Sequence, residues 1–423
     1  MSDGLQARIA EKAAELTELC RALVRIPSEN PPGRDYRAVC ELVGERLRRR
    51  GFEVAYVRAE GALGDNDRHP RWNVIARLES GRPGPTVHFN SHVDVVAPGA
   101  GWSRDPFGGE VADGRVYGRG TCDMKGGLAA SIAAVEALQE AGLTTAGALE
   151  VSATADEESG GHAGVAWLAE RGWFSPARID HVIIPEPFNR DLVCLGHRGV
   201  WWAEIETFGH IAHGSMPFQG DCAVRHMTAL VDALERELWP RLEERATAVP
   251  VIPPAARRAS LNLAALHGGA PERIDGLPTP LVPDRCRLTI DRRYLEEETK
   301  VDVVAEITEI LERLRAARPG FAHRMRELMH VPPVANDAGA PTPMAVARAI
   351  AAVEGAAARF VASPGTYDQK HVHHIGGVTD CVAYGPGHLH LAHQPDEYVE
   401  VRDLVNAAAV MALAAHDLTG AGR

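Results

Sequence analysis

The sequence predicts an α/β fold: a main domain with a mainly parallel sheet flanked by helices, and a smaller α+β sandwich inserted into it. Up to about residue 195, short apolar strands alternate with helical segments, which is the pattern of a parallel sheet covered by helices. From Gly199 the rhythm changes to four strands and two helices, which is typical of a small sandwich. These strands are expected at 200–208, 260–267, 285–293 and 322–329, and the helices at 222–239 and 297–316.

The first pattern then returns, so the main domain is expected to be split by the insertion. A helix at 342–353, a strand at 381–384 and a helix at 401–418 form this last part. A chain of 423 residues exceeds one ordinary core, and two domains fit that length. The expected boundaries are 1–198 for the first half of the main domain, 199–330 for the inserted domain and 331–423 for the second half.

The composition excludes several functional classes. A formal net charge of −12 argues against nucleic acid as a partner. No apolar run is long enough to span a bilayer, and residues 1–26 show an amphipathic helix pattern without the apolar centre of a signal peptide. Seven cysteines without metal-type pairing suit reduced thiols. We therefore expect a cytoplasmic protein that binds neither membranes nor nucleic acids.

A first pair of polar residues follows an apolar strand. The segment 86–90 (TVHFN) is typical of a buried strand, and His92 and Asp94 come directly after it. Two residues apart in extended chain, they face the same side, so Asp94 could accept a hydrogen bond from the far ring nitrogen of His92 and fix its tautomer. A strand-end histidine beside a solvated aspartate is the alternative for this segment alone.

A glycine-rich turn presents the next carboxylate. Residues 118–127 (GRGTCDMKGG) run into an apolar helix at 128–138, and Asp123 stands just before that helix. The spacing is not that of a phosphate-binding loop. An ordinary carboxylate at a helix N-terminus remains the alternative.

Two further acidic segments also end apolar strands. The strand 149–154 leads to Glu157 and Glu158, which would point to opposite faces of an extended chain and so could do different work. In this interpretation Glu158 binds a metal and Glu157 takes a proton from water, whereas a solvated acidic turn is the alternative. Glu186 stands between two prolines after the strand 181–184.

Histidines near the C-terminus complete the set. His388, His390 and His393 stand close together, and spacing alone cannot choose among them. Two histidines, one aspartate and two glutamates nevertheless match the ligand requirement of a two-metal hydrolase site, with one glutamate left over as a base.

Five segments resemble the signature blocks of a known family, the co-catalytic metallopeptidases and deacylases. Its members include acetylornithine deacetylase, succinyl-diaminopimelate desuccinylase, aminoacylase and a bacterial glutamate carboxypeptidase. The segments are NSHVDVV, YGRGTCDMKGG, ATADEESGG, PEP and AHQPDE, in the family's order and spread over nearly the whole chain.

The resemblance implies a role for each of these residues. It assigns two divalent cations, expected to be zinc with cobalt or manganese as alternatives, and settles the histidine question in favour of His393. By this match Asp94 orients His92, and Glu157 is the general base and acid. The implied ligands are His92 and Glu186 for one metal, Glu158 and His393 for the other, and Asp123 as the bridge between them.

The resemblance also assigns residues in the insertion, which would be a lid and dimerisation domain. His213 matches a histidine that reaches across a dimer interface to steady the oxyanion, so a homodimer is expected. A turn histidine packed under Pro217 is the alternative. Asn262 and Arg293 match positions that hold a small-molecule substrate, and Arg suits a carboxylate because its planar fork donates two parallel hydrogen bonds.

The expected activity is metal-assisted hydrolysis of an amide bond in a small N-acylated amino acid. A dipeptidase or carboxypeptidase is the alternative, as is a hydrolase of a formylaminopyrimidine or an aromatic amine. Lys370 stands where some desuccinylases have Arg, so it would not grip a second carboxylate in the same bidentate way. A succinylated substrate is therefore not implied.

Overall fold

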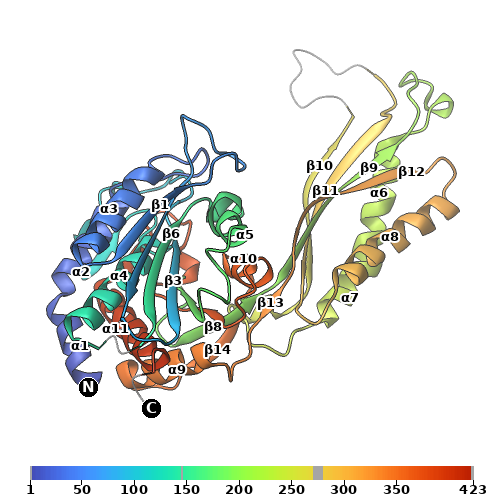
Figure 1. Ribbon diagram of the computed structural model, residues 1–423. Coiled ribbons are helices and arrows are strands. Elements are labelled where there is room, and N and C mark those ends of the chain that lie inside the picture. Colours follow the sequence, from blue (N-terminus) through green and yellow to red (C-terminus); the bar gives the residue numbers. More distant parts are fainter. Residues whose placement is uncertain (1, 144–145, 270–279, 421–423) are drawn as a thin grey trace. The chain divides into compact units, whose positions relative to one another are not determined.

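A computed structural model describes residues 2–143, 146–269 and 280–420 of the chain. The chain forms two compact units (Figure 1). The first comprises Met1–Gly196, Asn336–Val361 and Tyr367–Arg423, and is therefore discontinuous in sequence. The second comprises His197–Ala335 and Ala362–Thr366.

The first unit is built on a large mixed sheet. Seven of its strands run in the order β1-β2-β6-β3-β7-β15-β8. The central neighbours β6, β3, β7 and β15 are parallel, and the pairings toward both edges are antiparallel. The predicted α/β class with a mainly parallel sheet is therefore confirmed. The strands are β1 (Glu53–Arg58), β2 (Trp72–Glu79), β3 (Thr86–His92), β6 (Ala148–Thr154), β7 (His181–Ile184), β8 (Leu192–His197) and β15 (Cys381–Ala383).

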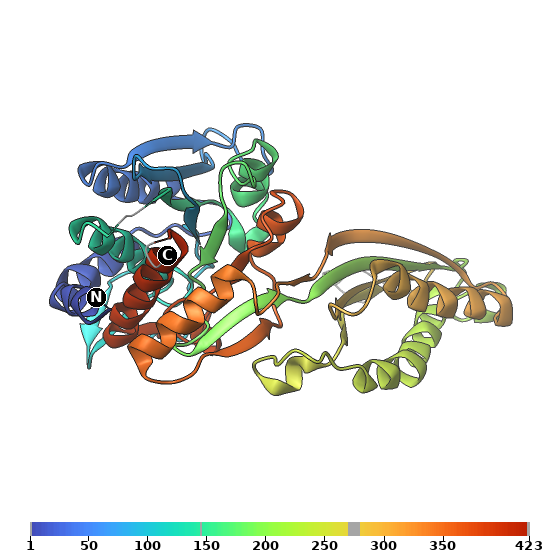
Figure 2. The same cartoon turned by 60° about the horizontal axis from the view of Figure 1, so that its bottom comes forward.

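Helices cover this sheet, and α11 lies beside both α4 and α9 (Figures 1 and 2). The single N-terminal helix pattern of the sequence is two helices in the structure, which meet at Lys12. The helices of this unit are α1 (Ser2–Glu11), α2 (Ala13–Val24), α3 (Tyr36–Arg49), α4 (Lys125–Glu140), α5 (Trp167–Glu170), α9 (Pro341–Glu354), α10 (Gln369–His374) and α11 (Val401–Leu418).

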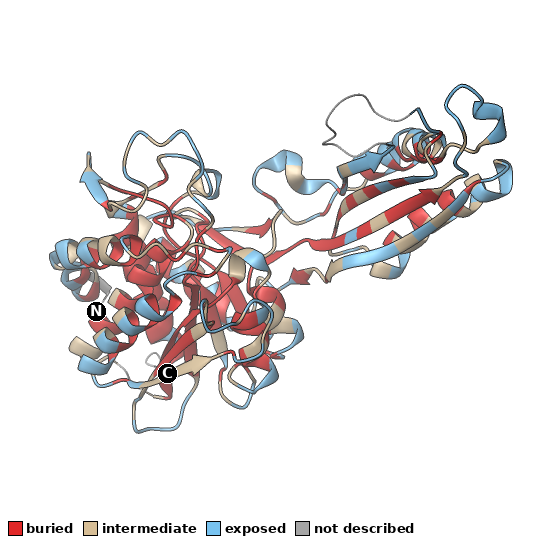
Figure 3. Ribbon diagram, turned by 90° about the horizontal axis from the view of Figure 1, so that it is seen from above, coloured by how far each residue is buried: buried red, intermediate tan, exposed pale blue. Residues whose placement is uncertain are grey.

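The start of α4 packs directly against the carboxyl ends of the strands. A Cβ atom added at Gly127 would lie 2.0 Å from the carbonyl oxygen of Pro185, so only glycine permits this approach. Every residue of β3 and β6 is buried (Figure 3). Apolar residues alternate with polar ones in both strands, and the buried polar side chains pair with one another: His88 contacts Glu150 at 2.8 Å and Ser152 at 2.7 Å.

Short elements complete the first unit. A small antiparallel sheet has the order β16-β5-β4. Within the described ranges, no helix is both long and apolar enough to cross a membrane. The short strands are β4 (Glu110–Ala112), β5 (Arg115–Tyr117) and β16 (Tyr398–Glu400), with β13 (Val334–Ala335) and β14 (Arg359–Ser363) where the chain passes between the units.

The second unit is a four-stranded antiparallel sheet with the order β10-β11-β9-β12, together with helices. The helix predicted at 222–239 is interrupted: it leaves α-helical geometry at Leu234–Leu238 and resumes just before Pro240. Proline has no N–H to donate to the preceding turn, which accounts for the break. The elements are β9 (Gly199–Phe208), β10 (Ser260–Gly268), β11 (Arg285–Tyr294), β12 (Ala322–Val331), α6 (Ala223–Ala233), α7 (Trp239–Glu244) and α8 (Lys300–Ala317).

Candidate metal centre

His92 ends the buried strand β3 and faces two carboxylates. Its Nε2 lies 3.1 Å from Asp123 Oδ1 and 3.9 Å from Glu186 Oε1. Its Nδ1 donates to the backbone carbonyl of Asp94 at 2.9 Å, which leaves Nε2 to face the cluster. Burial opposes the charged imidazole, but the hydrogen bond to Asp123 and the nearby carboxylates of Asp94 and Glu186 outweigh it and raise the pKa of His92 well above its usual value.

The position of the Asp94 carboxylate corrects one sequence expectation. It was predicted to accept the hydrogen bond from His92, but its Oδ1 lies 3.6 Å from Nδ1 and the carbonyl of the same residue accepts instead. The carboxylate accepts from Asn30 Nδ2 at 2.9 Å and from the backbone N–H groups of Glu157 and Glu158 at 3.2 and 3.1 Å. Asp94 therefore fixes the turn that carries both glutamates.

That turn is not extended, which corrects a second expectation. Glu157–Ser159 form one 3₁₀ turn, because the backbone of Asp156 has φ 62° and leaves the strand direction. Glu158 turns toward His393, whose Nε2 lies 3.1 Å from its Oε1, whereas Glu157 belongs to neither ligand cluster. The two glutamates are therefore in different surroundings, as expected. The cause is the 3₁₀ turn and not the alternation of side chains along an extended strand.

Asp123 lies between two groups of side chains. His393 Nε2 is 3.4 Å from its Oδ2, while His92 is on the side of Oδ1. Among the residues described, two clusters have ligand atoms that all lie within 4.8 Å of one another, and Asp123 belongs to both. One cluster is His92, Asp123 and Glu186, and the other is Asp123, Glu158 and His393.

The electrostatics of these clusters fit bound cations. Burial and then the charge of Asp123 raise the pKa of Glu158 to about 7 and that of Glu186 well above its usual value. Hydrogen bonds to Asp123 and Glu158 raise the pKa of His393 to about 10. In the metal-free protein the two histidines therefore hold protons next to the buried carboxylates, and divalent cations would supply positive charge at the same place in exchange for those protons.

Glu397 holds the loop of Asp123 in place. Its Oε1 accepts from the backbone N–H groups of Gly120, Cys122 and Asp123 at 3.0, 2.8 and 3.1 Å, and its Oε2 accepts from Arg119 Nη1 at 2.5 Å. Hydrogen bonds to charged groups are among the strongest in proteins, each about 1.5–3 kcal/mol. Sequence reasoning quoted Glu397 only as part of a motif and missed this role, because the contact joins residues far apart in the chain.

Lys370 was also missed as a neighbour of Glu157, the predicted base. It is buried at the start of α10, and its Nζ lies 3.4 Å from Glu157 Oε1. The next residue, His371, contacts the carbonyl of Gly160 through Nε2 at 2.7 Å. The histidine-rich segment thus packs against the turn of Glu157, and Lys370 has a carboxylate partner within the chain.

The other three predicted site residues lie in the second unit. His213 is exposed, and its Nδ1 accepts from the backbone N–H of Ser215 at 3.1 Å, so the neutral ring carries its proton on Nε2. Asn262 is exposed on β10. Arg293 donates from Nε and Nη2 to the two oxygens of Asp291 at 2.8 and 3.1 Å, so its fork is occupied within the chain.

Comparisons with known proteins agree with this geometry. Residues 88–417 match the family described as peptidase family M20/M25/M40. The chain belongs to that family. It is 29% identical to a succinyl-diaminopimelate desuccinylase from Methylobacterium radiotolerans, over 93% of this chain and 94% of the relative. It is 30% identical to the enzyme of the same name from Rhodospirillum centenum, over 80% and 82% of the two chains.

Solved structures of the M20 family share the fold. Human carnosine dipeptidase 1 superposes with a TM-score of 0.75 at 18% identity, over 99% of this chain and 98% of that one. A metallo-carboxypeptidase from Sulfolobus solfataricus superposes with a TM-score of 0.75 at 17% identity, over 95% and 98%. A Bacillus subtilis member described as a dinuclear metal-binding peptidase reaches 0.69 at 15% identity, over 97% and 99%. Membership of the M20 family, shown by the family match and the curated relatives, makes this chain a metal-dependent hydrolase of amide bonds.

Proposed function

We propose that the protein removes an acyl group from a small N-acylated amino acid, using two zinc ions and acting as a homodimer. One observation carries this proposal: two ligand clusters share Asp123, and Glu157 lies beside them without belonging to either. The desuccinylase relatives support a deacylase, although Lys370 engages Glu157 rather than standing free for a succinyl carboxylate.

The residues present fit a pair of divalent cations. His92 and Glu186 would hold one, Glu158 and His393 the other, and Asp123 both. Zinc accepts imidazole and carboxylate ligands in this combination, as do cobalt and manganese. When bound, the cations would polarise the amide carbonyl and lower the pKa of the attacking water.

The protein's own groups would move the proton and stabilise the developing charge. Glu157 accepts the proton of the attacking water and passes it to the leaving nitrogen, while Lys370 holds its carboxylate in place. Nε2–H of His213 of the partner subunit donates to the oxyanion, which exists only as the carbonyl is attacked. Arg293 and Asn262 would bind the substrate, and for Arg293 a substrate carboxylate would have to replace Asp291.

The proposal is tested by amine release from N-acetyl, N-formyl and N-succinyl amino acids and from dipeptides. The enzyme is reconstituted with metal, and the Glu157→Ala variant serves as the blank. We expect hydrolysis of one acyl class, absent in the blank. Hydrolysis of dipeptides alone would replace the deacylase by a peptidase. No release from any member of the panel, with metal bound, would refute both and favour a substrate that is not an amino acid derivative.

His213→Ala is expected to lower kcat by about a hundredfold or more, the usual cost of removing one oxyanion donor. The fold should be unchanged, because the side chain is exposed. The measurement is steady-state kinetics together with a thermal melt. His210→Ala, an exposed histidine of the same loop, is the matched control and should remain near wild type. Equal activity of the two variants would refute the role of His213.

Metal binding is expected to release protons and to strengthen as the pH rises. In the metal-free protein the pKa of His393 is about 10 and that of Glu158 about 7, so His393 is protonated at neutral pH and Glu158 partly so. A metal requires its ligands deprotonated, so its affinity should rise with pH by about tenfold per pH unit for each ligand proton that the metal displaces. Competition with a chelator at a series of pH values measures the slope. A pH-independent affinity would contradict this assignment of ligands.

A further inference from the structure

Arg198, at the start of the second unit, is a buried cation whose best donors are unused. The residue is 4% exposed, and its Nε and Nη2 make no hydrogen bond to any described residue. Burial lowers its pKa, and the neighbouring cations Arg293 and Arg292 act in the same direction against the charges of Glu296 and Glu298. Buried N–H donors without a hydrogen-bond partner cost free energy, so this side chain would be stabilised by an acceptor that a ligand supplies.

The two unused atoms are the pair that binds carboxylates. Nε and Nη2 form one edge of the guanidinium, whose parallel N–H groups match the two oxygens of a carboxylate. Arg293 shows this arrangement within the same unit, where its Nε and Nη2 donate to the two oxygens of Asp291. The free fork of this region is therefore that of Arg198, not that of Arg293.

Arg198 lines a hollow whose size and walls suit a small organic ligand. The hollow has a volume of about 480 Å³, within the range of small-molecule sites. Its walls are mostly apolar, and include Trp239 and Leu242 of α7, Leu261 of β10 and Pro364. Arg258 and Arg293 add positive charge, and among the described lining residues Glu243 alone carries a carboxylate.

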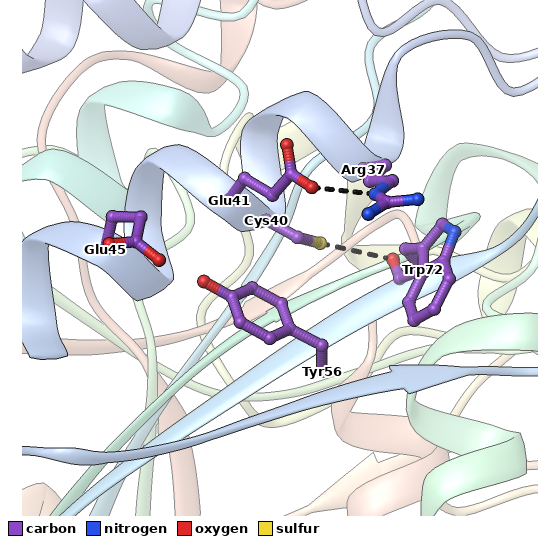
Figure 4. A pocket seen from close by; sticks show the side chains of 6 residues that line it. All are labelled: Arg37, Cys40, Glu41, Glu45, Tyr56 and Trp72. Atoms are coloured by element: carbon purple, nitrogen blue, oxygen red, sulfur yellow. Dashed lines mark hydrogen bonds and ion pairs between the residues drawn. The ribbon is translucent and has the colours of Figure 1, made fainter.

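A hollow in the first unit shows the contrast (Figure 4). It lies at α3 and strands β1 and β2, and is lined in part by Arg37, Glu41 and Glu45. There Arg37 donates to Glu41 at 2.7 Å, and Glu45 is paired with Arg48. Its charged groups are thus satisfied within α3, whereas Nε and Nη2 of the buried Arg198 have no acceptor among the described residues.

We propose that the hollow lined by Arg198 binds a small carboxylate with an apolar body, held by a bidentate pair of hydrogen bonds from Nε and Nη2. The apolar walls would cover the body of the ligand. The carboxylate is either that of a substrate or product or that of a separate effector, and both present the same chemistry to Arg198. The site follows from the guanidinium and its surroundings, and does not depend on the hydrolytic activity proposed above.

The test is a titration of the full chain with butyrate and, in parallel, with the uncharged butyramide. Binding is followed by tryptophan fluorescence, and the Trp239→Phe variant shows whether the signal arises at the hollow. Metal-loaded and chelator-treated protein are both titrated, because a carboxylate also binds metals. We expect saturable binding of butyrate in both preparations and none of butyramide. Equal binding of the two compounds, or binding of butyrate only to metal-loaded protein, would refute the site.

Variants then assign the site to Arg198. Arg198→Gln should weaken butyrate about tenfold to a hundredfold, the cost of losing hydrogen bonds to a charged group, and Arg198→Lys should restore part of the affinity without the fork. Arg241→Gln removes the same charge from the exposed face of α7, outside the hollow, and should bind as wild type. Unchanged binding by a folded Arg198→Gln would overturn the proposal. If that variant does not fold, the comparison of butyrate with butyramide on the unaltered protein decides.

Inhibition kinetics distinguish the two sources of the carboxylate. Competitive inhibition of amide hydrolysis by butyrate would assign the site to the acid group of substrate or product. Non-competitive inhibition or activation would assign it to an effector. If the protein hydrolyses no amide in the panel, the binding result stands by itself, so the failure of one proposal is separable from that of the other.

Discussion

Glu157→Gln is expected to lower kcat by about a hundredfold to ten-thousandfold, the range that general acid–base catalysis contributes. The amide has the size of the carboxylate but cannot take a proton from water. Glu157 lies outside both ligand clusters, so both metals should remain bound. The Michaelis constant should change little, because the group acts in the chemical step. Steady-state kinetics with a parallel measurement of metal content check both parts.

A matched substitution separates this effect from a general loss of charge. Glu170 ends α5, is exposed, and lies in the same stretch of chain. Glu170→Gln should therefore have wild-type kcat and metal content. Near wild-type turnover by Glu157→Gln would remove this residue from the mechanism. Loss of metal by that variant would instead make it a ligand, contrary to the clusters described here.

The strands that position the site could be predicted because apolar residues recur in each of them at strand spacing. Apolar residues alternate with polar ones at 86–90 (TVHFN) and 149–154 (LEVSAT) and are consecutive at 182–184 (VII), and these segments are β3, β6 and β7 of the structure. These strands are parallel neighbours, so their carboxyl ends meet at one edge of the sheet. The polar residues that follow them are brought together there, which is where ligands bind in open α/β sheets.

Contacts between distant segments could not be predicted from local pattern. Glu397 lies more than 270 residues from the Asp123 loop whose N–H groups it binds. Lys370 lies 213 residues from Glu157. Neither contact has a periodicity or a spacing in the sequence, since both depend on the completed fold. The turn at Glu157 likewise departs from the extended chain expected there, because its conformation is set by Asp94 and by the positive φ of Asp156.

His393 was predicted as a metal ligand from the family resemblance, because spacing in the sequence could not distinguish it from His388 and His390. His388 and His390 have rings 5.4 Å apart and belong to neither ligand cluster within the described residues. His393 has φ 64°, an uncommon backbone conformation for a non-glycine residue, and its Nε2 lies near Asp123 and Glu158. Backbone conformation at a single loop residue is not encoded in hydrophobic periodicity, so the residues alone left three candidates.

Asp123→Asn is expected to abolish both metal sites at once. Each carboxylate oxygen faces a different cluster, Oδ1 toward His92 and Oδ2 toward His393. Asparagine keeps one oxygen and turns an NH₂ donor toward the other cluster, so at least one cation would meet a hydrogen-bond donor in place of a ligand. Metal affinity should fall by more than about a hundredfold. Mutation of a group that only orients a ligand already lowers metal affinity by about 10–100-fold, and Asp123 would be a ligand itself. Turnover should then be undetectable.

The stability of the Asp123→Asn variant gives the sharper test. In the metal-free protein burial opposes the charge of Asp123, but the hydrogen bonds from His393 and His92 outweigh it and hold the pKa of Asp123 well below its usual value. Its charge therefore stabilises the folded protein at neutral pH, and the metal-free variant should melt below the temperature of the metal-free wild type. Wild type should gain stability with added metal in proportion to RT ln(1 + [metal]/Kd), and the variant should gain none. A metal-induced rise in its melting temperature would show that one site survives without Asp123, and would refute a shared bridging ligand. Glu186→Gln, which alters one cluster only, should by contrast retain part of the metal-induced gain.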